Sequence, residues 1–543
     1  MRNPFRGTAI GSTLVALAAW TLLSVSAIAG TFSSLLETRF QEGLADVTGT
    51  EAEQTLAVVQ AVYAKDSYTP LWVTREGADV RARELAQALR ALRLDGLDPE
   101  DYGLSTLERL LGETRADKLV ELEVRLSLGL VQAASDLASG RLQPRAVNPK
   151  LYIYPQDVDK AAVLTQARDE EEIAAFLQSF QPSQANYHRL KSALAGYRRL
   201  ALGPKSPPIK AGKTLDLGRQ SERVDRLRAR LATLGDYSET VAAGIPFDHI
   251  LEQAVKRFQY RHGLTVDGRV GPKTLAALNV PIRDRVTQML LNMERRRWMP
   301  DTFEKRYVFV NLADFELKVV DTIEGRERTI HTTEVVVGKP FHQTPEFSHQ
   351  IRYLVINPYW NVPRSIARNE LLPKFKKDLG IIAEKGYELL EDWTRNAKLV
   401  DPASIDWGSV TRRSFKFRIR QSPGPLNALG QIKFIFPNRH NIYLHDTPAR
   451  SLFDRTERAF SHGCIRVKAP DVLAGTLLQW QDGWPLSRIH NTIESGTRTV
   501  VSLKKPVPVH LAYVTAWVNK DGTVHFREDI YKRDAVLKKA LLH

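Results

Sequence analysis

The chain has 543 residues but only one cysteine, Cys464, so no disulfide can form within it. After residue 27 it also lacks any apolar run long enough to span a membrane. Its hydrophobic and charged fractions, 43% and 26%, are those of ordinary globular proteins. These features exclude a disulfide-stabilised small scaffold, a polytopic membrane protein and a largely disordered or collagen-like chain. At about 150 residues per domain, the length predicts three or four domains that fold in water.

Acidic residues are fewer than basic ones. Lys and Arg together number 77 and Asp and Glu 62, which gives a formal net charge of +15. Such an excess predicts attraction to a polyanion, and the candidates are nucleic acid, anionic lipid and a carboxylate-rich polymer.

The first residues of the chain narrow these candidates. Arg2 and Arg6 precede an apolar stretch from Thr8 to Ala27, and Ala27-Ile28-Ala29 has the small-x-small pattern of a cleavage site. Residues 1–29 are therefore predicted to be a signal peptide or, if they are retained, an anchor in the inner membrane. Because positive charge stays on the cytoplasmic side, the rest of the chain is expected in the periplasm or cell envelope. Nucleic acid is then not an expected partner.

The first half of the chain shows helical periodicity. Residues 31–202 carry apolar residues at steps of three and four, which predicts a helical domain without catalytic motifs. A proline-containing stretch, 203–211, is predicted to be a linker. Residues 212–280 then predict three short helices, at 224–234, around 251–258 and from Pro272 onward.

After residue 306 the hydrophobic period changes to two, which predicts a β-rich domain over 305–500. Its expected strands include 307–312, 334–337, 353–356, 415–419, 432–436 and 441–445. The alternation lapses over 366–413, where a partly helical insertion, with a helix over Leu371 to Leu390, is predicted to cover a site. Residues 501–543 are predicted to be a C-terminal extension.

Cys464 is the strongest candidate for a reactive residue in this sequence. A lone thiol in an exported chain is either buried and inert or reactive. Two histidines, His445 and His462, and two arginines near it in sequence offer a base and positive charge, which favours a nucleophile. Gly463 permits a turn whose N–H groups can hold an oxyanion.

The sequence lacks the motifs that other reaction classes require. The two histidines lie 17 residues apart, and no fourth ligand stands at a recognisable zinc spacing, so no metal is expected. The sequence also has no Gly-x-Ser-x-Gly elbow, His-Glu-x-x-His motif or Walker loop, and no cofactor is expected. Cysteine-based acyl transfer is the remaining reaction class.

Two segments resemble known bacterial cell-wall modules. Residues 224–272, with Gly263-Leu264, Asp267-Gly268 and Gly271-Pro272, resemble the peptidoglycan-binding module of wall enzymes. The run Ser-His-Gly-Cys-Ile-Arg-Val at 461–467, preceded by His-x-Thr-Pro at 445–448, resembles the signature of the L,D-transpeptidase catalytic domain. The segments 357–363 and 423–430 resemble the large periplasmic branch of that family, which also carries an N-terminal scaffold domain and a capping insertion.

The resemblance implies a multidomain α+β protein. Its parts would be a helical scaffold domain, a three-helix peptidoglycan-binding domain and a β-sandwich-like catalytic domain with a partly helical capping insertion. The implied activity cleaves a tetrapeptide stem after its third residue, forms a cysteine thioester and passes the acyl group to an amine, giving a 3-3 peptidoglycan cross-link. The implied partners are donor and acceptor tetrapeptide stems and, through residues 212–280 with basic residues such as Lys256, Arg257, Arg261 and Lys273, the wall itself.

The resemblance also assigns roles to individual residues. Cys464 would be the nucleophile and His445 the general base, oriented by the backbone carbonyl of Asp446. His462, Gly463 and Arg466 would shape the loop, with Tyr443 helping to stabilise the oxyanion. Three more residues are substrate-binding candidates: Trp360, Arg458 and Ser461.

Several alternatives stay open on sequence grounds. Relatives often have Gly or Ser at position 446, and the Asp446 carboxylate could raise the pKa of His445, although a solvent-facing side chain is favoured. Arg458 and Arg466 could instead form salt bridges on the sheet surface, and Trp360 could fill the core. His462 has no evident orienting partner in its own segment. Two other functions fit the same motifs: an L,D-carboxypeptidase or hydrolase with water as acceptor, and a non-catalytic wall-binding scaffold.

Overall fold

The computed structural model describes residues 32–44, 48–204, 207–240, 242–394, 396–479, 481 and 483–542. The predicted signal segment, residues 1–29, lies outside these ranges. Within them, no helix combines the length and the apolar character that crossing a membrane requires. The chain forms two compact units: one holds 1–141, 155–196 and 293–301, and the other holds 142–154, 197–292 and 302–543.

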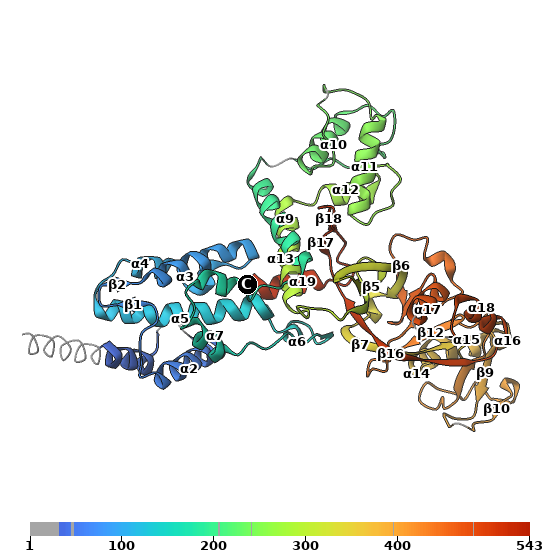
Figure 1. The fold of residues 1–543 in the computed structure, drawn as a ribbon. Helices are drawn as coiled ribbons and strands as arrows, with labels where there is room; N and C mark the ends of the chain where they lie inside the picture. The colour runs from blue at the N-terminus through green and yellow to red at the C-terminus, as the bar shows by residue number, and fades with distance from the viewer. Residues whose placement is uncertain are drawn as a thin grey trace, which may run out of the picture. The chain divides into compact units, whose positions relative to one another are not determined.

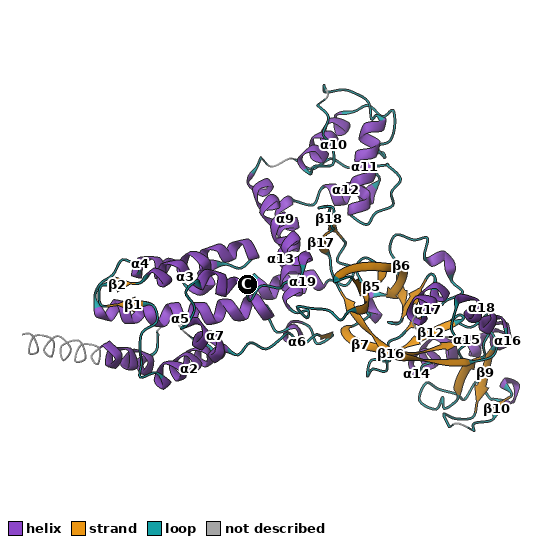
Figure 2. Cartoon of the chain, in the orientation of Figure 1, coloured by secondary structure: helices purple, strands orange, loops and turns teal. Residues whose placement is uncertain are grey.

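The first unit is helical, apart from the short hairpin of β1 (Val73–Thr74) and β2 (Gly77–Ala78) (Figure 2). Its central helix is α5 (Ala116–Ser139), whose buried face carries leucines at the predicted helical spacing. Around it are α2 (Thr50–Lys65), α3 (Val80–Ala91), α4 (Leu104–Leu110), α7 (Lys160–Ala167) and α8 (Ile173–Gln178). The predicted helical character of this region is confirmed. Two further helices, α9 (Ala185–Leu202) and α13 (Ile282–Arg297), contribute residues to both units.

The second unit begins its three-helix part with α10 (Glu222–Thr233), α11 (His249–Arg261) and α12 (Pro272–Leu278), which confirms the three predicted helices. Val224, Leu227, Phe258 and other apolar side chains from these helices form one core. Arg261, however, is buried and paired with Asp236, so it is not available to bind wall carboxylates as expected. Its place in the helix pattern could not reveal this partner.

A ten-stranded sheet dominates the rest of this unit (Figure 1). Its order is β12-β13-β15-β6-β5-β4-β16-β7-β3, and β12 also pairs with β7, which closes the sheet on itself. The strands are β3 (Leu151–Tyr152), β4 (Arg306–Asn311), β5 (Glu316–Ile323), β6 (Arg326–Gly338), β7 (Glu346–Ile356), β12 (Ile432–Ile435), β13 (Leu444–His445), β14 (Ala459–Ser461, paired with β6), β15 (Ile465–Val467) and β16 (Thr499–Ala512). Two helices, α17 (Pro470–Leu478) and α18 (Leu486–Glu494), pack apolar residues into the same core.

The C-terminal residues are part of this domain. β16 crosses the expected boundary at residue 500 and pairs with both β7 and β4, so residues 501–512 belong to the sheet. Beyond it are the hairpin β17 (Ala516–Val518) and β18 (Val524–Phe526) and the helix α19 (Arg533–Leu541).

The insertion forms a small subdomain that extends beyond the predicted 366–413 on both sides, and its own core includes Val362, Phe375, Trp407 and Ile419. Its four-stranded sheet has the order β10 (Leu399–Val400), β9 (Tyr387–Leu390), β11 (Arg418–Gln421) and β8 (Trp360–Asn361). The expected helix over Leu371 to Leu390 is wrong in part: helices α15 (Leu372–Lys377) and α16 (Gly380–Glu384) are followed by strand β9. The strand expected at 415–419 is shifted: β11 covers Arg418–Gln421 and joins this small sheet, because alternation predicts a strand and not its neighbour.

Candidate active site

Cys464 lies in the short loop between β14 and β15. The preceding Gly463 has φ of 114°, a conformation that disfavours any residue with a side chain. Its backbone also comes close to Gly338 at the end of β6, where an added Cβ would lie 3.1 Å from the Gly463 Cα and 2.0 Å from the His342 carbonyl oxygen. The two glycines therefore let the cysteine loop lie against the end of β6.

The predicted base lies in a row of side chains across three neighbouring strands. His445 on β13 pairs with Lys433 on β12 and with Arg466 on β15. Paired residues on adjacent strands project from the same face of a sheet. The histidine is therefore flanked by two cations on the face that also carries Tyr443, two residues before it.

The imidazole of His445 is held in one tautomer. Its Nδ1 lies 2.5 Å from the backbone carbonyl oxygen of Asp446, which can only accept, so Nδ1 carries the proton and Nε2 keeps a lone pair. Burial, together with the nearby charges of Arg466 and Lys433, lowers the pKa of His445 to about 3, although hydrogen bonds to the backbone of Asp446 and Leu429 act in the opposite direction. The ring is thus neutral at physiological pH, as a general base must be.

The thiol of Cys464 is also neutral at rest. Its sulfur lies 3.6 Å from the backbone carbonyl oxygen of Asn441, to which it donates. Burial raises the pKa of the thiol, whereas a hydrogen bond from the Tyr443 side chain and the charges of Lys433 and Arg466 act in the opposite direction. These groups are placed to stabilise negative charge on sulfur once a base removes its proton.

The lowered pKa of His445 predicts an unusual pH profile. A protonated imidazole cannot accept the thiol proton, so lowering the pKa extends the active range toward acid. We expect the rate of Cys464 acylation to show no loss between about pH 8 and pH 5, where an ordinary histidine would titrate near 6.5. Intact-protein mass spectrometry of quenched reactions measures this rate, and circular dichroism at each pH checks the fold. An acid limb centred near 6.5 would contradict the assigned environment.

Asp446 corrects one expectation. Its side chain is only 2% exposed, so the favoured solvent-facing orientation is wrong. The carboxylate accepts from the backbone N–H of Gln431 at 2.8 Å and of Thr447 at 2.6 Å, and it pairs with Arg450 at 2.6 Å. It occupies the space beside Gly430, where a Cβ would lie 2.2 Å from a carboxylate oxygen. Asp446 therefore reaches His445 through its backbone and uses its side chain to fix the turn before β12.

His462 has a partner that the sequence did not reveal. Its Nε2 lies 2.6 Å from Oε1 of Glu370, and its ring centroid is 5.0 Å from that of His342. Glu370 belongs to the helical turn at Ala367–Leu371 of the insertion. The expectation that His462 lacks an orienting partner holds only within its own segment, because the partner is 92 residues away in sequence. This contact links the insertion to the cysteine loop.

The three substrate-binding candidates have structural partners. Ser461 is 2% exposed; its Oγ donates to the Cys464 carbonyl oxygen at 2.5 Å and accepts from the Gly463 N–H at 3.0 Å. Arg458 donates to backbone carbonyl oxygens of Val335, Arg455 and Phe315. Trp360 is partly buried against the insertion core. These positions favour loop building and packing over contact with substrate.

Among the residues that the structure describes, Arg466 has no salt bridge of the kind considered from sequence. Its side chain is largely buried beside the thiol, and its Nε has no hydrogen-bond partner within the described part of the chain. This placement favours an electrostatic role toward Cys464.

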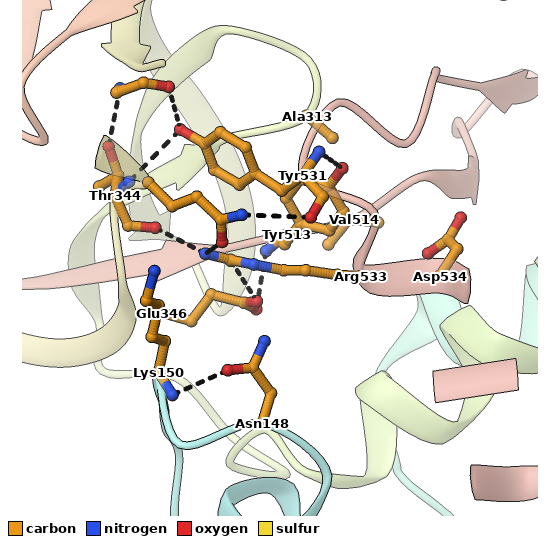
Figure 3. Close-up of polar contacts among 12 residues, drawn as sticks. Asn148, Lys150, Ala313, Thr344, Glu346, Tyr513, Val514, Tyr531, Arg533 and Asp534 are labelled. Atoms are coloured by element: carbon orange, nitrogen blue, oxygen red, sulfur yellow. Dashed lines mark hydrogen bonds and ion pairs between the residues drawn. The ribbon is translucent and has the colours of Figure 1, made fainter. Parts of the chain in front are cut away.

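A buried polar cluster, in which Arg533 of the C-terminal segment contacts Thr344 and Glu346 (Figure 3), is linked to the cysteine loop through Thr344. Arg533 pairs with Glu346 at 2.5 Å and donates to the Thr344 carbonyl oxygen at 2.8 Å. Thr344 Oγ1 in turn donates to the Gly463 carbonyl oxygen at 2.8 Å and accepts from the Gly338 N–H at 3.0 Å. Sequence analysis missed Arg533, Glu346 and Thr344, because none of them stands near the cysteine motif in the sequence.

Comparison with family models matches three consecutive regions of the chain. Residues 57–194 match a scaffold domain, residues 220–278 match a "Putative peptidoglycan binding domain" and residues 305–501 match an L,D-transpeptidase catalytic domain.

Similar proteins were found among curated sequences and solved structures. The "Putative L,D-transpeptidase" of Haemophilus influenzae is 38% identical over 256 residues, which cover 47% of this chain and 50% of the relative. The chain thus matches about half the length of that relative. An L,D-transpeptidase structure from Stackebrandtia nassauensis is 16% identical, with 57% of this chain and 97% of that one covered and a TM-score of 0.21. An L,D-transpeptidase structure from Xylanimonas cellulosilytica is also 16% identical. The match covers 57% of this chain and 100% of that one, with a TM-score of 0.17.

Proposed function

We propose that this chain, which carries an L,D-transpeptidase catalytic domain behind a scaffold domain and a peptidoglycan-binding domain, forms 3-3 peptidoglycan cross-links through a thioester on Cys464. The observation that supports this most is the neutral His445, held in one tautomer on the sheet face that carries Tyr443 and adjoins the cysteine loop.

The first half-reaction makes the acyl-enzyme. Nε2 of His445 takes the thiol proton, and the sulfur attacks the carbonyl carbon between the third and fourth residues of a tetrapeptide stem. The Tyr443 hydroxyl and backbone N–H groups of the loop around Gly463 stabilise the oxyanion. The carbon–nitrogen bond then breaks, the imidazolium gives its proton to the departing amine, and a thioester remains.

In the second half-reaction Cys464 becomes the leaving group, and His445 first accepts a proton and then returns it to the sulfur. An amine of an acceptor stem attacks the thioester carbonyl carbon and gives a proton to His445. The carbon–sulfur bond breaks, the thiol of Cys464 is re-formed, and a new amide joins the two stems. If water takes the place of the amine, the same intermediate gives a shortened tripeptide stem and no cross-link.

Purified tetrapeptide muropeptides test the proposed activity. We expect chromatography of the products to show cross-linked dimers that require Cys464, with a Cys464→Ala variant as the control. Tripeptides alone would identify a hydrolase. If a folded protein shows no turnover, a non-catalytic wall-binding scaffold is the remaining candidate function.

We infer that the protein is exported and acts on the wall in the periplasm. Arg2, Arg6 and the apolar stretch after them support export, and the peptidoglycan-binding domain supports a wall partner. Fractionation of cells that express the full chain is expected to place it in the envelope, released or anchored in the inner membrane. Recovery in the cytoplasm with an unprocessed N-terminus would contradict export.

A further inference from the structure

A basic pocket of about 360 Å³ lies beside the candidate active site. Its floor comes from β7 and β12, through Tyr353, Val355 and Lys433, and its wall from β8 and β11 of the insertion. Among the described residues, four cationic ones and no acidic one line it: Arg418, Arg420, Lys433 and Arg498. A pocket of this composition fits an anion.

Lys433 joins this pocket to the catalytic residues. It pairs directly with His445 across two strands, whose backbones lie about 5 Å apart in any sheet. Its Nζ is 3.7 Å from the ring centroid of Tyr443, the residue that hydrogen-bonds the Cys464 sulfur. An anion held by Lys433 therefore lies next to the reacting sulfur.

Within the described residues, three of the four cations have no anionic partner. Arg420 pairs with Glu388 at 2.5 Å, and Arg418 donates to the Thr394 carbonyl oxygen at 3.0 Å. In the described ranges no carboxylate pairs with Lys433 or Arg498, and burial together with Arg498 lowers the pKa of Lys433. Because a partly buried cation without a partner is costly, this arrangement favours an anion supplied by a ligand.

The proposed reaction brings such an anion to this place. The residue that leaves is the last one of the stem, so its amide nitrogen and its free carboxylate are attached to the same carbon. Bond lengths and angles put the carboxylate carbon about 2.5 Å from that nitrogen. Whenever the scissile carbonyl lies at Cys464, the carboxylate must lie within a few ångströms of it.

We propose that Lys433, with Arg498, binds the terminal carboxylate of the donor stem in the basic pocket. This inference rests on the proposed function and adds the group by which the enzyme selects stems that end at the fourth residue. A charge-assisted hydrogen bond to this carboxylate both positions the scissile bond and excludes longer or capped stems.

The test compares two donors that differ only at their last group: a tetrapeptide with a free carboxylate and the same peptide with a terminal carboxamide. The rate of acylation of the full protein is measured for each by quenched intact-protein mass spectrometry, without acceptor. We expect the parent to prefer the carboxylate by about 10- to 100-fold in kcat/KM. The preference should fall to about 1- to 3-fold in Lys433→Gln, fall partly in Arg498→Gln and persist in Lys433→Arg.

The comparison of donors separates binding of the carboxylate from a general effect on the thiol. Lys416→Gln is the matched control, because Lys416 is an exposed lysine of the insertion outside the pocket, and it should keep the full preference. If Lys433→Gln slows both donors equally and keeps the preference, or if the parent acylates both donors at one rate, the carboxylate assignment is overturned while the proposed function stands. If a folded parent is acylated by neither donor, the proposed function fails and this inference with it.

Discussion

Replacing His445 with alanine is expected to slow acylation of Cys464 by about 100- to 10,000-fold, the usual cost of losing a general base. The thiol pKa is raised by burial, so little thiolate forms without a base, and only His445 is held in the required tautomer on the strand beside Cys464. His462 is engaged with Glu370, so its removal should change loop position and slow acylation much less.

A carbapenem, which the family resemblance suggests as a thioester-forming inhibitor, gives the readout by intact-protein mass. Cys464→Ala sets the baseline, and each variant is first shown to be folded by circular dichroism. Acylation of His445→Ala at the parent rate, together with loss in His462→Ala, would reverse the assignment of the two histidines.

Replacing Arg533 with methionine should be the most destabilising change in the C-terminal segment. The side chains of Arg533 and Glu346 are each 3% exposed, and loss of the cation leaves a buried carboxylate without its partner. Breaking such a pair costs about 3–5 kcal/mol. For a domain of this size we expect the corresponding melting temperature to fall by roughly 6–20 °C. Because Arg533 holds the segment that binds Gly463, acylation of Cys464 should also weaken.

Two further variants isolate the buried pair. Lys538→Met makes the same chemical change at an exposed position of α19 and should leave the melting temperature within about 1–2 °C of the parent. The double variant Arg533→Met with Glu346→Leu removes both charges and should recover much of the lost stability. Calorimetry measures all of them, and a parent-like melting temperature for Arg533→Met would show that the pair contributes little.

Local patterns predicted some elements of the fold and missed others, such as β9 and α19. Periodicity placed α10, α11 and most strands of the large sheet, because helix and strand periods depend on residues close in sequence. It could not predict which sheet a strand joins, so the strand near β11 was assigned to the large β domain, and the expected domain boundary at residue 500 fell inside β16, which was not predicted as a strand. Strand pairing depends on contacts between residues far apart in the chain.

The same limit applies to the candidate site. Cys464 and His445 were found because their motif segments lie close together in the sequence. The residues that surround them in the fold were not found. Glu370, Lys433 and Arg533 act on the site through three-dimensional contacts, and nothing in their local sequence marks them. Asp446 shows the same limit, since its side chain was expected to face solvent and instead is buried against the backbone N–H of Gln431 and paired with Arg450.

Trapping the acyl-enzyme tests the central claim most directly. The full protein is incubated with a tetrapeptide stem, quenched in acid during turnover and analysed by intact-protein and peptide mass spectrometry. The account predicts a mass gain equal to the stem less its fourth amino acid, located on Cys464, lost on treatment with hydroxylamine and absent from Cys464→Ala. Product formation without such an adduct, or an adduct on another residue, would contradict it.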